Sequence, residues 1–163
     1  MNNIILIGMP GSGKSTIGVL LAKNLGYDFV DTDLLIQKET GERLCEIIKQ
    51  KGADSLAKIE EEICKNLLCD KTVIATGGSA VLSDEAMKHF RGMGKIVFLG
   101  VPLSVLCERV GDLDERGVVR HKGQSFENLF EERLPLYRKY ADITVGAKGD
   151  AGDMAKEIAE IVG

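Results

Sequence analysis

Tryptophan is absent from the sequence, proline and histidine are scarce, and there is no excess of basic residues. The chain has three prolines and two histidines, and 21 lysines and arginines against 25 acidic residues give a net charge of −4. Nucleic-acid-binding surfaces normally carry a basic excess, so we expect no nucleic-acid partner. The apolar runs are far shorter than the ~20 residues that cross a bilayer, and Met1-Asn2-Asn3 is not a basic leader. We therefore expect a cytoplasmic protein without a membrane partner.

Metal-binding and disulfide patterns are also missing. No two cysteines have CxxC spacing or a nearby histidine, so we expect reduced thiols that mostly pack in the interior. His89 and His121 are too isolated to indicate a metal site, and His89 is predicted on the surface of a helix. The four cysteines are Cys45, Cys64, Cys69 and Cys107.

Short apolar runs alternate with helical stretches along the chain, which predicts an α/β fold with about five parallel strands and helices on both faces. At 163 residues, residues 1–163 are expected to form one domain. Ligands in such sheets bind beyond the carboxyl ends of the strands. The predicted strands are Ile4–Ile7, Phe29–Val30, Val73–Ala75, Ile96–Leu99 and Ile143–Val145.

The first strand leads into Gly8-Met-Pro-Gly-Ser-Gly-Lys-Ser15, and a helical run from Ser15 to Leu25 follows. G-x-x-x-x-G-K-S between a strand and a helix indicates a P-loop, whose backbone amides and helix dipole hold phosphates. Lys14 is placed to bridge the outer two phosphates of a nucleotide, and the Ser15 hydroxyl to ligate Mg²⁺. We expect the chain to bind ATP and Mg²⁺. The predicted nucleotide contacts here are Gly11, Ser12, Gly13, Lys14, Ser15 and Thr16.

Two carboxylates, Asp31 and Asp33, follow the second strand. Residues two apart in a strand share a face, so both are expected to point toward the phosphates. Asp31 is predicted to hold a water of Mg²⁺, and Asp33 to accept the proton of an acceptor hydroxyl or to orient it. Aspartate is also a good helix N-cap, and Asp33 precedes a helical run from Leu34, so capping is a compatible alternative.

The segment from Val110 to Gln124 carries three glycines and shows no apolar period, which predicts a mobile loop. Arg116 and Arg120 lie on it. A loop arginine is often only a surface charge, but the glycine-bearing context favours Arg116 as a lid residue that closes over the phosphates.

Beyond this loop, Ser125 is predicted to cap a helix that runs to about Lys139, with a kink or break at Pro135. Whether Arg133 in this helix binds an anionic ligand is left open by the residues alone. Helices are also predicted from Leu103 to Arg109 and from Asp150 to Val162. The last one would pack through Met154, Ile158, Ile161 and Val162.

Together these motifs resemble the shikimate kinase family, small P-loop kinases related in fold to nucleoside monophosphate kinases. The similarity spans nearly the whole chain, and D-T-D followed much later by R-x-P-L-Y is more specific than the P-loop. The residues that carry it are Gly8–Thr16, Asp31–Asp33, Gly77-Gly78, Arg109, Arg116 and Glu132–Tyr137.

The resemblance implies a three-layer α/β/α kinase domain with strand order 2-3-1-4-5, which phosphorylates a ring hydroxyl of shikimate with ATP in aromatic amino acid biosynthesis. Its lid would span about residues 110–124 and its acceptor-binding helices about residues 33–61. The resemblance assigns Asp33, Gly77, Gly78 and Arg133 to shikimate, Arg116 to the lid and catalysis, Arg109 to the nucleotide near its adenine, and Ser15 and Asp31 to Mg²⁺.

Three positions differ from the family pattern. Leu56-Ala57 replaces a phenylalanine-arginine pair, whose arginine clamps the substrate carboxylate together with the one matching Arg133. Lys58 is a candidate replacement, although it sits ~100° around the helix. Ser79 replaces a third glycine beside the substrate, and Gly117 replaces a proline after the lid arginine, which predicts a more flexible lid.

Other functions are compatible with these residues. A kinase of the same fold could act on another small polyhydroxylated acceptor that needs less carboxylate clamping, and a nucleotide-binding module could have lost transfer. Transfer to a nucleoside monophosphate is disfavoured, because the chain lacks the length for a large insert and has few aromatics to stack a second base. We expect a monomeric kinase with shikimate or a related acceptor as its small-molecule partner.

Overall fold

The computed structural model describes residues 2–146 and 148–163, and its centre is a parallel sheet of five strands in the order β2-β3-β1-β4-β5. Both the fold class and this strand order confirm the expectation from the sequence. Each strand extends one residue or more beyond its apolar run. The strands are β1 (Asn3–Ile7), β2 (Asp28–Asp31), β3 (Thr72–Ala75), β4 (Gly94–Gly100) and β5 (Ile143–Gly146).

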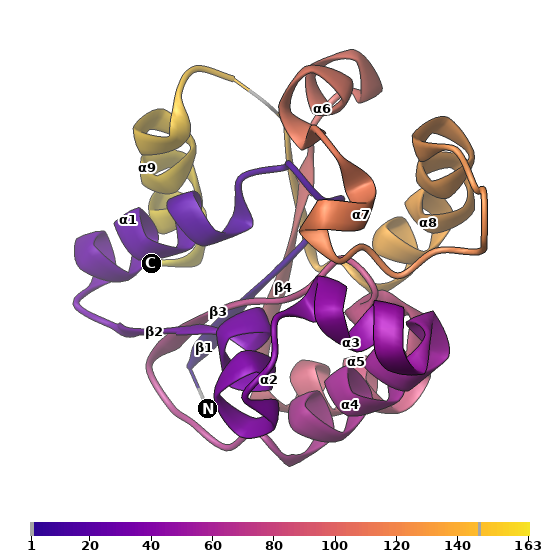
Figure 1. Ribbon diagram of the computed structural model, residues 1–163. Coiled ribbons are helices and arrows are strands. Elements are labelled where there is room, and N and C mark those ends of the chain that lie inside the picture. The colour runs from indigo at the N-terminus through magenta and orange to yellow at the C-terminus, as the bar shows by residue number, and fades with distance from the viewer. Residues whose placement is uncertain (1, 147) are drawn as a thin grey trace.

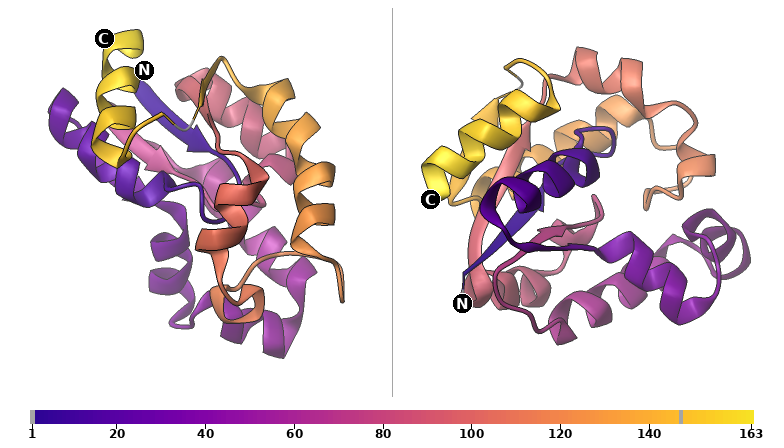
Figure 2. Two further views of the ribbon diagram at one scale, coloured as in Figure 1. Left: turned by 90° about the horizontal axis from the view of Figure 1, so that it is seen from above. Right: turned by 90° about the vertical axis from the view of Figure 1, so that its left-hand side faces the viewer.

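The helices of the described residues cover both faces of this sheet, and Figures 1 and 2 show the resulting layers. One face carries the first and last helices, and the other carries the fourth, fifth, sixth and eighth. The helices are α1 (Lys14–Leu25), α2 (Thr32–Thr40), α3 (Leu44–Lys51), α4 (Ala53–Asn66), α5 (Asp84–Met93), α6 (Leu103–Val110), α7 (Leu113–Arg116), α8 (Phe126–Tyr140) and α9 (Ala151–Val162), with a short 3₁₀ turn η1 (Ala80–Leu82).

The central strand β1 explains why the apolar runs are continuous. Ile4 and Leu6 pack with α1 and α9, whereas Ile5 and Ile7 pack on the opposite face of the sheet. β1 pairs with β3 on one side and β4 on the other, and helices cover both faces of the sheet, so all its side chains are buried. Parallel strands covered on both faces read as unbroken apolar runs rather than alternating ones.

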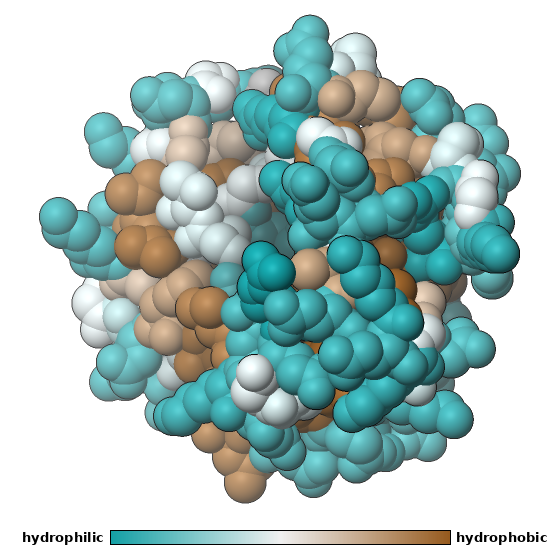
Figure 3. All heavy atoms as spheres, in the orientation of Figure 1, coloured by the Kyte–Doolittle hydropathy of each residue, from teal (hydrophilic) through white to brown (hydrophobic). Residues whose placement is uncertain are grey.

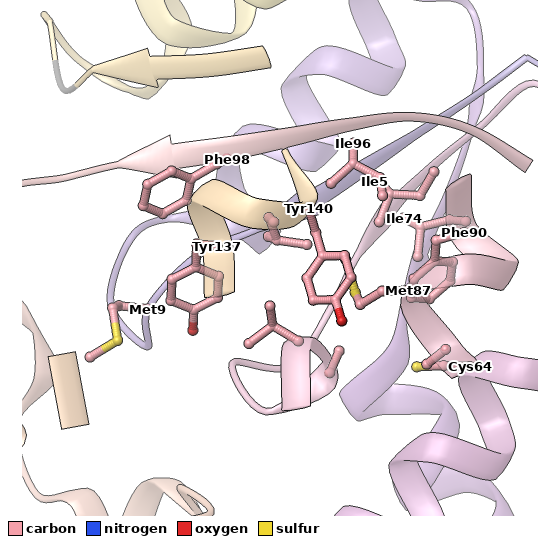
Figure 4. Packing of buried hydrophobic residues seen from close by; sticks show 14 of the residues in the cluster. Ile5, Met9, Cys64, Ile74, Met87, Phe90, Ile96, Phe98, Tyr137 and Tyr140 are labelled. Carbon is pink, nitrogen blue, oxygen red and sulfur yellow. The ribbon is translucent and has the colours of Figure 1, made fainter. Parts of the chain in front are cut away.

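The larger core cluster lies between the sheet and α4, α5, α6 and α8 (Figure 4). Phe98 of β4 and Tyr137 of α8 stack with ring centroids 5.1 Å apart. The Tyr137 hydroxyl donates to the Gly78 carbonyl oxygen at 2.8 Å. This core therefore fixes α8 against the turn that follows β3.

A third, small cluster holds the helices between β2 and β3 together. Ile36 of α2, Ile47 of α3 and Leu56 of α4 are buried against one another, and Val119 packs on them from the segment after α7. In Figure 1, α7 lies beside α3 accordingly. The predicted acceptor region and the predicted lid thus share a hydrophobic contact. Hydrophilic residues dominate the surface over α2, α3 and α7 in Figure 3.

The structure corrects several predictions about local structure. The segment from Val110 to Gln124 contains the short helix α7, because Asp112 caps it by accepting from the Asp114 and Glu115 amides. Helix α8 begins at the predicted cap Ser125 but continues through Pro135 without a break. In α9, Met154 and Ile158 are buried as expected, whereas Ile161 is 50% exposed.

The prediction that His89 lies on the surface of a helix is also wrong. His89 is half-buried, and its Nε2 lies 2.7 Å from the Leu67 carbonyl oxygen. In the described part of the chain, no helix combines the length and apolar character needed to cross a bilayer.

Candidate active site

A cavity of about 530 Å³ opens at the carboxyl ends of the strands, where the sequence predicted a ligand site. Its lining includes four basic and two acidic side chains, although the chain as a whole has a net charge of −4. This local basic excess suits an anionic ligand. The charged lining residues are Lys14, Arg109, Arg116, Arg133, Asp33 and Glu60.

The P-loop connects β1 to α1 and forms one wall of this cavity. Gly11 and Gly13 have φ angles of +86° and +94°, a region that side-chain-bearing residues rarely adopt, which explains glycine there. Lys14 is 9% exposed, and its Nζ donates to the carbonyl oxygens of Gly8 and Met9 at 2.7 and 2.9 Å. Because these acceptors are neutral, the ammonium charge remains available to a phosphate. Ser12, Ser15 and Thr16 line the cavity beside it.

Burial lowers the pKa of Lys14 to about 8, and Asp33 opposes this shift. A buried ammonium is disfavoured because it loses hydration, and the negative charge of Asp33 recovers part of the loss. The bound phosphates of a nucleotide would act in the same direction as Asp33.

Asp31 ties the start of α2 to the P-loop helix. One carboxylate oxygen accepts from Ser15 Oγ at 2.6 Å, and the other accepts from the Asp33 amide at 2.9 Å. Asp31 is therefore the N-cap of α2, which corrects the alternative that Asp33 caps a helix from Leu34. Asp31 is not among the described residues that line the cavity, but its hydrogen-bond partner Ser15 is.

Asp33 lines the cavity opposite the P-loop, but not for the reason the sequence suggested. The helix begins at Thr32, so Asp31 and Asp33 are not alternate residues of one strand. Within the described residues the Asp33 carboxylate has no hydrogen bond. Burial and the charge of Asp31 raise the pKa of Asp33 to about 6, and Lys14 opposes the increase.

The turn after β3 lines the cavity beside Asp33, Glu60 and Arg133. Thr32, which the sequence analysis did not single out, is buried and accepts from the Gly77 amide at 3.0 Å. A Cβ at Gly77 would overlap Glu60 Oε2 and lie 2.8 Å from Asp33 Oδ1. A Cβ at Gly78 would lie 3.0 Å from Arg133 Nη1. Both glycines therefore allow charged side chains to approach the backbone closely.

Arg133 is 1% exposed and lies in the cavity wall between α8 and the segment after α7. Its Nη2 donates to the Val119 carbonyl oxygen. Its Nε has no hydrogen-bond partner among the described residues. Its Nη1 lies beside the Gly78 backbone in the cavity wall and makes no hydrogen bond in the described residues. A buried guanidinium with a free donor at the wall of a cavity is suited to bind a carboxylate.

Arg109 of α6 and Arg116 of α7, the expected nucleotide contact and the expected lid residue, are exposed side chains that line the cavity. Arg120 is different, because its guanidinium donates to Asp114 Oδ1 and to the Gln124 carbonyl oxygen. It stabilises the loop and does not line the cavity in the described structure.

Gly117 caps α7 at a φ of +73° and is buried against α3. A Cβ there would lie 2.5 Å from Leu44 Cβ and 2.7 Å from the Cys45 nitrogen. We expect Gly117→Ala to displace α7 and to increase hydrogen exchange of the amides from Leu113 to Val119 by about tenfold, because the strain and the collision act together.

Gly26→Ala is a matched control for this prediction. Gly26 caps α1 in the same left-handed conformation as Gly117, with φ and ψ of +68° and +36° against +73° and +44°. No atom of the described residues lies within 4 Å of the position that a Cβ would take at Gly26, so the variant carries the backbone strain without the collision. An equal increase in exchange around the two substituted positions would show that contact with α3 does not hold α7 in place.

Lys58 does not occupy the position that the sequence analysis assigned to it. Its side chain is exposed and is not part of the cavity lining that the structure describes. On α4 the buried residues are Leu56, Glu60 and Cys64, so Lys58 faces away from them. We expect Lys58→Ala to leave the KM for the acceptor within about twofold of wild type, with Arg133→Lys as the positive control. A large increase in KM for Lys58→Ala would contradict this placement.

Glu60 is the cavity residue that the sequence analysis missed. It is 4% exposed and accepts from Ser79 Oγ at 2.5 Å. Burial and the charge of Asp33 raise its pKa to about 7, while Ser79, Arg133 and Lys14 oppose the increase. A signal existed in the sequence, because Glu60 stands between Leu56 and Cys64 at i, i+4 spacing on the buried stripe of α4.

A cavity lined by a P-loop, by two carboxylates and by arginines from α6, α7 and α8 defines a P-loop kinase of small molecules. Comparison with known proteins gives the family. The shikimate kinase family model matches residues 10–162, so the chain belongs to the shikimate kinase family.

Individual relatives agree with this assignment. The chain is 41% identical to a shikimate kinase of Thermodesulfovibrio yellowstonii over 91% of this chain and 87% of that protein. It is 38% identical to a shikimate kinase of Aquifex aeolicus over 95% and 92% of the two chains. The structure superimposes with a TM-score of 0.91 on a shikimate kinase from Acinetobacter baumannii in complex with shikimate, at 30% identity over 99% of this chain and 93% of that one.

Proposed function

We propose that this chain transfers the γ-phosphoryl group of ATP to a ring hydroxyl of shikimate. The observation that carries the proposal is that Lys14 and the Asp33 carboxylate, which has no hydrogen bond in the described structure, line one cavity within range of each other's charge. Phosphoryl transfer depends mainly on positioning and on charge stabilisation, and this cavity supplies both. Membership of a family of ATP-dependent kinases supports the nucleotide.

In this proposal one end of the cavity binds the nucleotide and the other binds the acceptor. The amides from Gly11 to Thr16 and the Lys14 ammonium hold the triphosphate, and Arg116 adds positive charge from the lid. Asp33 accepts the proton of the attacking hydroxyl, or orients that hydroxyl toward the terminal phosphorus. Arg109 contacts the nucleotide.

The acceptor binds at the other end of the cavity. Arg133 binds the carboxylate of shikimate through its free Nη1 beside Gly78, because it is the buried guanidinium at this end. Gly77 and Gly78 let the ring approach the turn after β3. Glu60 and Ser79 lie beside them at the same end.

Mg²⁺ fits the residues present. Ser15 and Asp31 offer oxygen ligands 2.6 Å from each other, and Mg²⁺ in proteins keeps several waters and takes few protein ligands. No cluster of three or more metal-binding side chains occurs in the described residues, which suits an ion held largely by the nucleotide. When bound, the ion would neutralise phosphate charge.

A kinase with a different acceptor is the second candidate. Ala57 provides no guanidinium, and Lys58 lies outside the cavity, so in the described structure Arg133 has no second cation from α4 to share a carboxylate with. A polyhydroxylated acceptor that relies less on a carboxylate would suit this arrangement. A non-catalytic nucleotide-binding module is disfavoured, because Lys14, Ser15, Asp31 and Asp33 are all in place.

A coupled assay of ADP release separates these functions. We expect turnover that requires ATP, Mg²⁺ and shikimate together, measured against a panel of hydroxylated acids and sugars. Turnover with another panel member but not with millimolar shikimate would favour the second candidate. Tight ATP binding without stimulation by any acceptor would favour the non-catalytic module.

We propose a single kinase domain that acts as a cytoplasmic monomer and has no nucleic-acid or membrane partner. Sedimentation equilibrium at working concentration tests the monomer, since a dimer would double the observed mass.

A further inference from the structure

Ser79 and Glu60 form a hydrogen-bonded pair at the acceptor end of the cavity. Ser79 lies in the turn after β3 and is 8% exposed, and Glu60 lies on α4 and is 4% exposed. Ser79 Oγ donates to Glu60 Oε1 at 2.5 Å. Both side chains line the cavity, so the pair joins an acceptor-binding helix to the turn beneath the acceptor.

The two oxygens of Glu60 have different surroundings. Oε1 is held by Ser79, whereas Oε2 approaches Gly77 so closely that a Cβ there would overlap it. Asp33 Oδ1 lies over the same glycine. Oε2 therefore faces the end of the cavity where Asp33 meets the acceptor hydroxyls.

No ion pair holds Glu60 in the described residues, even though it is buried. Lys14, Arg133 and Asp33 face it from the P-loop, α8 and α2, and all three influence its pKa. Neither cation lies within ion-pair distance in the described structure. A buried carboxyl group without a partner is costly, so the neutral Ser79 hydroxyl has the main part in fixing its orientation.

This arrangement coincides with two departures from the family pattern. The chain has Ala57 where an arginine is usual, and a serine where the third glycine of the turn is usual. The first change removes a cation from α4, and the second supplies a hydroxyl beside the same helix.

We infer that Ser79 is a positioning residue, whose hydroxyl holds the Glu60 carboxyl group so that its second oxygen accepts a hydrogen bond from an acceptor hydroxyl next to Asp33. The inference rests on the proposed function for the identity of the acceptor, but the contact itself does not. It makes the acceptor end of this chain depend more on hydroxyl recognition and less on carboxylate clamping.

Steady-state kinetics of Ser79→Ala test this role. We expect the KM for shikimate to rise about fivefold to twentyfold, because one hydrogen bond to a charged group is lost, while the KM for ATP stays within about twofold. Ser79→Thr keeps a hydroxyl and is expected to restore the KM. In a Glu60→Ala background, Ser79→Ala should add no further increase. An equal increase there, or an equal change in the KM for ATP, would overturn the inference.

The ionisation of Glu60 gives a readout that needs no turnover. The Ser79 hydrogen bond lowers the pKa of Glu60 against the effects of burial and Asp33. Ser79→Ala should therefore raise the midpoint of the Glu60 carboxyl carbon titration in NMR above its wild-type value of about 7, and Ser79→Thr should leave it in place. An unchanged midpoint in a folded Ser79→Ala variant would overturn the inference.

These two experiments also separate the inference from the proposed function. Absence of shikimate-dependent ADP release by the wild-type chain would contradict the proposed function, and the titration would then decide the role of Ser79. Wild-type turnover combined with a normal KM in Ser79→Ala would contradict the inference alone.

Discussion

Replacing Lys14 with alanine is expected to lower kcat by about 10²–10³-fold, the effect of removing one preorganised donor from a developing negative charge. Lys14 is buried at the base of the P-loop with only neutral hydrogen-bond acceptors, so its charge has no carboxylate partner at ion-pair distance in the described residues. In the proposed reaction the γ-phosphoryl group gains charge stabilisation from this ammonium during transfer. The coupled ADP-release assay at saturating ATP measures the change.

Lys23→Ala is the matched control for Lys14→Ala. Lys23 lies in the last turn of the same helix, α1, and is exposed. It should keep wild-type kcat within about twofold. Because Lys14 also binds the Gly8 and Met9 carbonyl oxygens, thermal unfolding of both variants has to be measured. A folded Lys14→Ala protein with near wild-type kcat would contradict the assignment of the P-loop as the catalytic phosphate site.

The P-loop part of the cavity could be predicted from the sequence because it is local. The P-loop, from Gly8 to Ser15, combines its strand, its glycines and its helix start within a few consecutive residues. Backbone geometry there follows from residue type, since Gly11 and Gly13 adopt positive φ angles. The strand order was also predicted correctly, but from the family resemblance rather than from the residues.

The acceptor half was harder to predict because it is assembled from distant segments. Glu60 and Ser79 are 19 residues apart, and only the tertiary fold shows that they touch. Lys58 was proposed from its place in the sequence beside Ala57, whereas the orientation of α4 directs it to solvent. Helix phase decides such cases, and the buried stripe of α4 indicates Glu60 rather than Lys58.

Asp33 lines the cavity as expected, although the local argument that placed it there was wrong. The expectation that Asp31 and Asp33 share a strand face fails because Thr32 already begins α2. The Asp31 carboxylate accepts two hydrogen bonds, one from Ser15 Oγ and one from the Asp33 amide. This leaves Asp33 as the carboxylate without a hydrogen bond in the described structure, and its placement in the cavity follows from the cap.

Asp33→Asn is therefore expected to lower kcat by about 10²–10⁴-fold, the usual contribution of a general base. Asparagine keeps the size of the side chain and one acceptor oxygen, and no hydrogen bond of the described structure depends on the Asp33 carboxylate. The variant should fold normally and keep its KM for ATP within about threefold. It loses the ability to take up the proton of the acceptor hydroxyl, so the loss should appear in kcat.

Asp28→Asn controls for the removal of a negative charge near α2. Asp28 begins β2 and is exposed, so its substitution should leave kcat unchanged. Two roles of Asp33 are separated by whether Asp33→Asn changes kcat or the KM for shikimate. If the carboxylate only orients the acceptor, the amide oxygen can still accept a hydrogen bond, and the variant would mainly raise the KM for shikimate. If it takes the proton, kcat falls and the KM changes little, which is the outcome that a cavity carboxylate without a hydrogen bond in the described structure, with its pKa raised to about 6, supports.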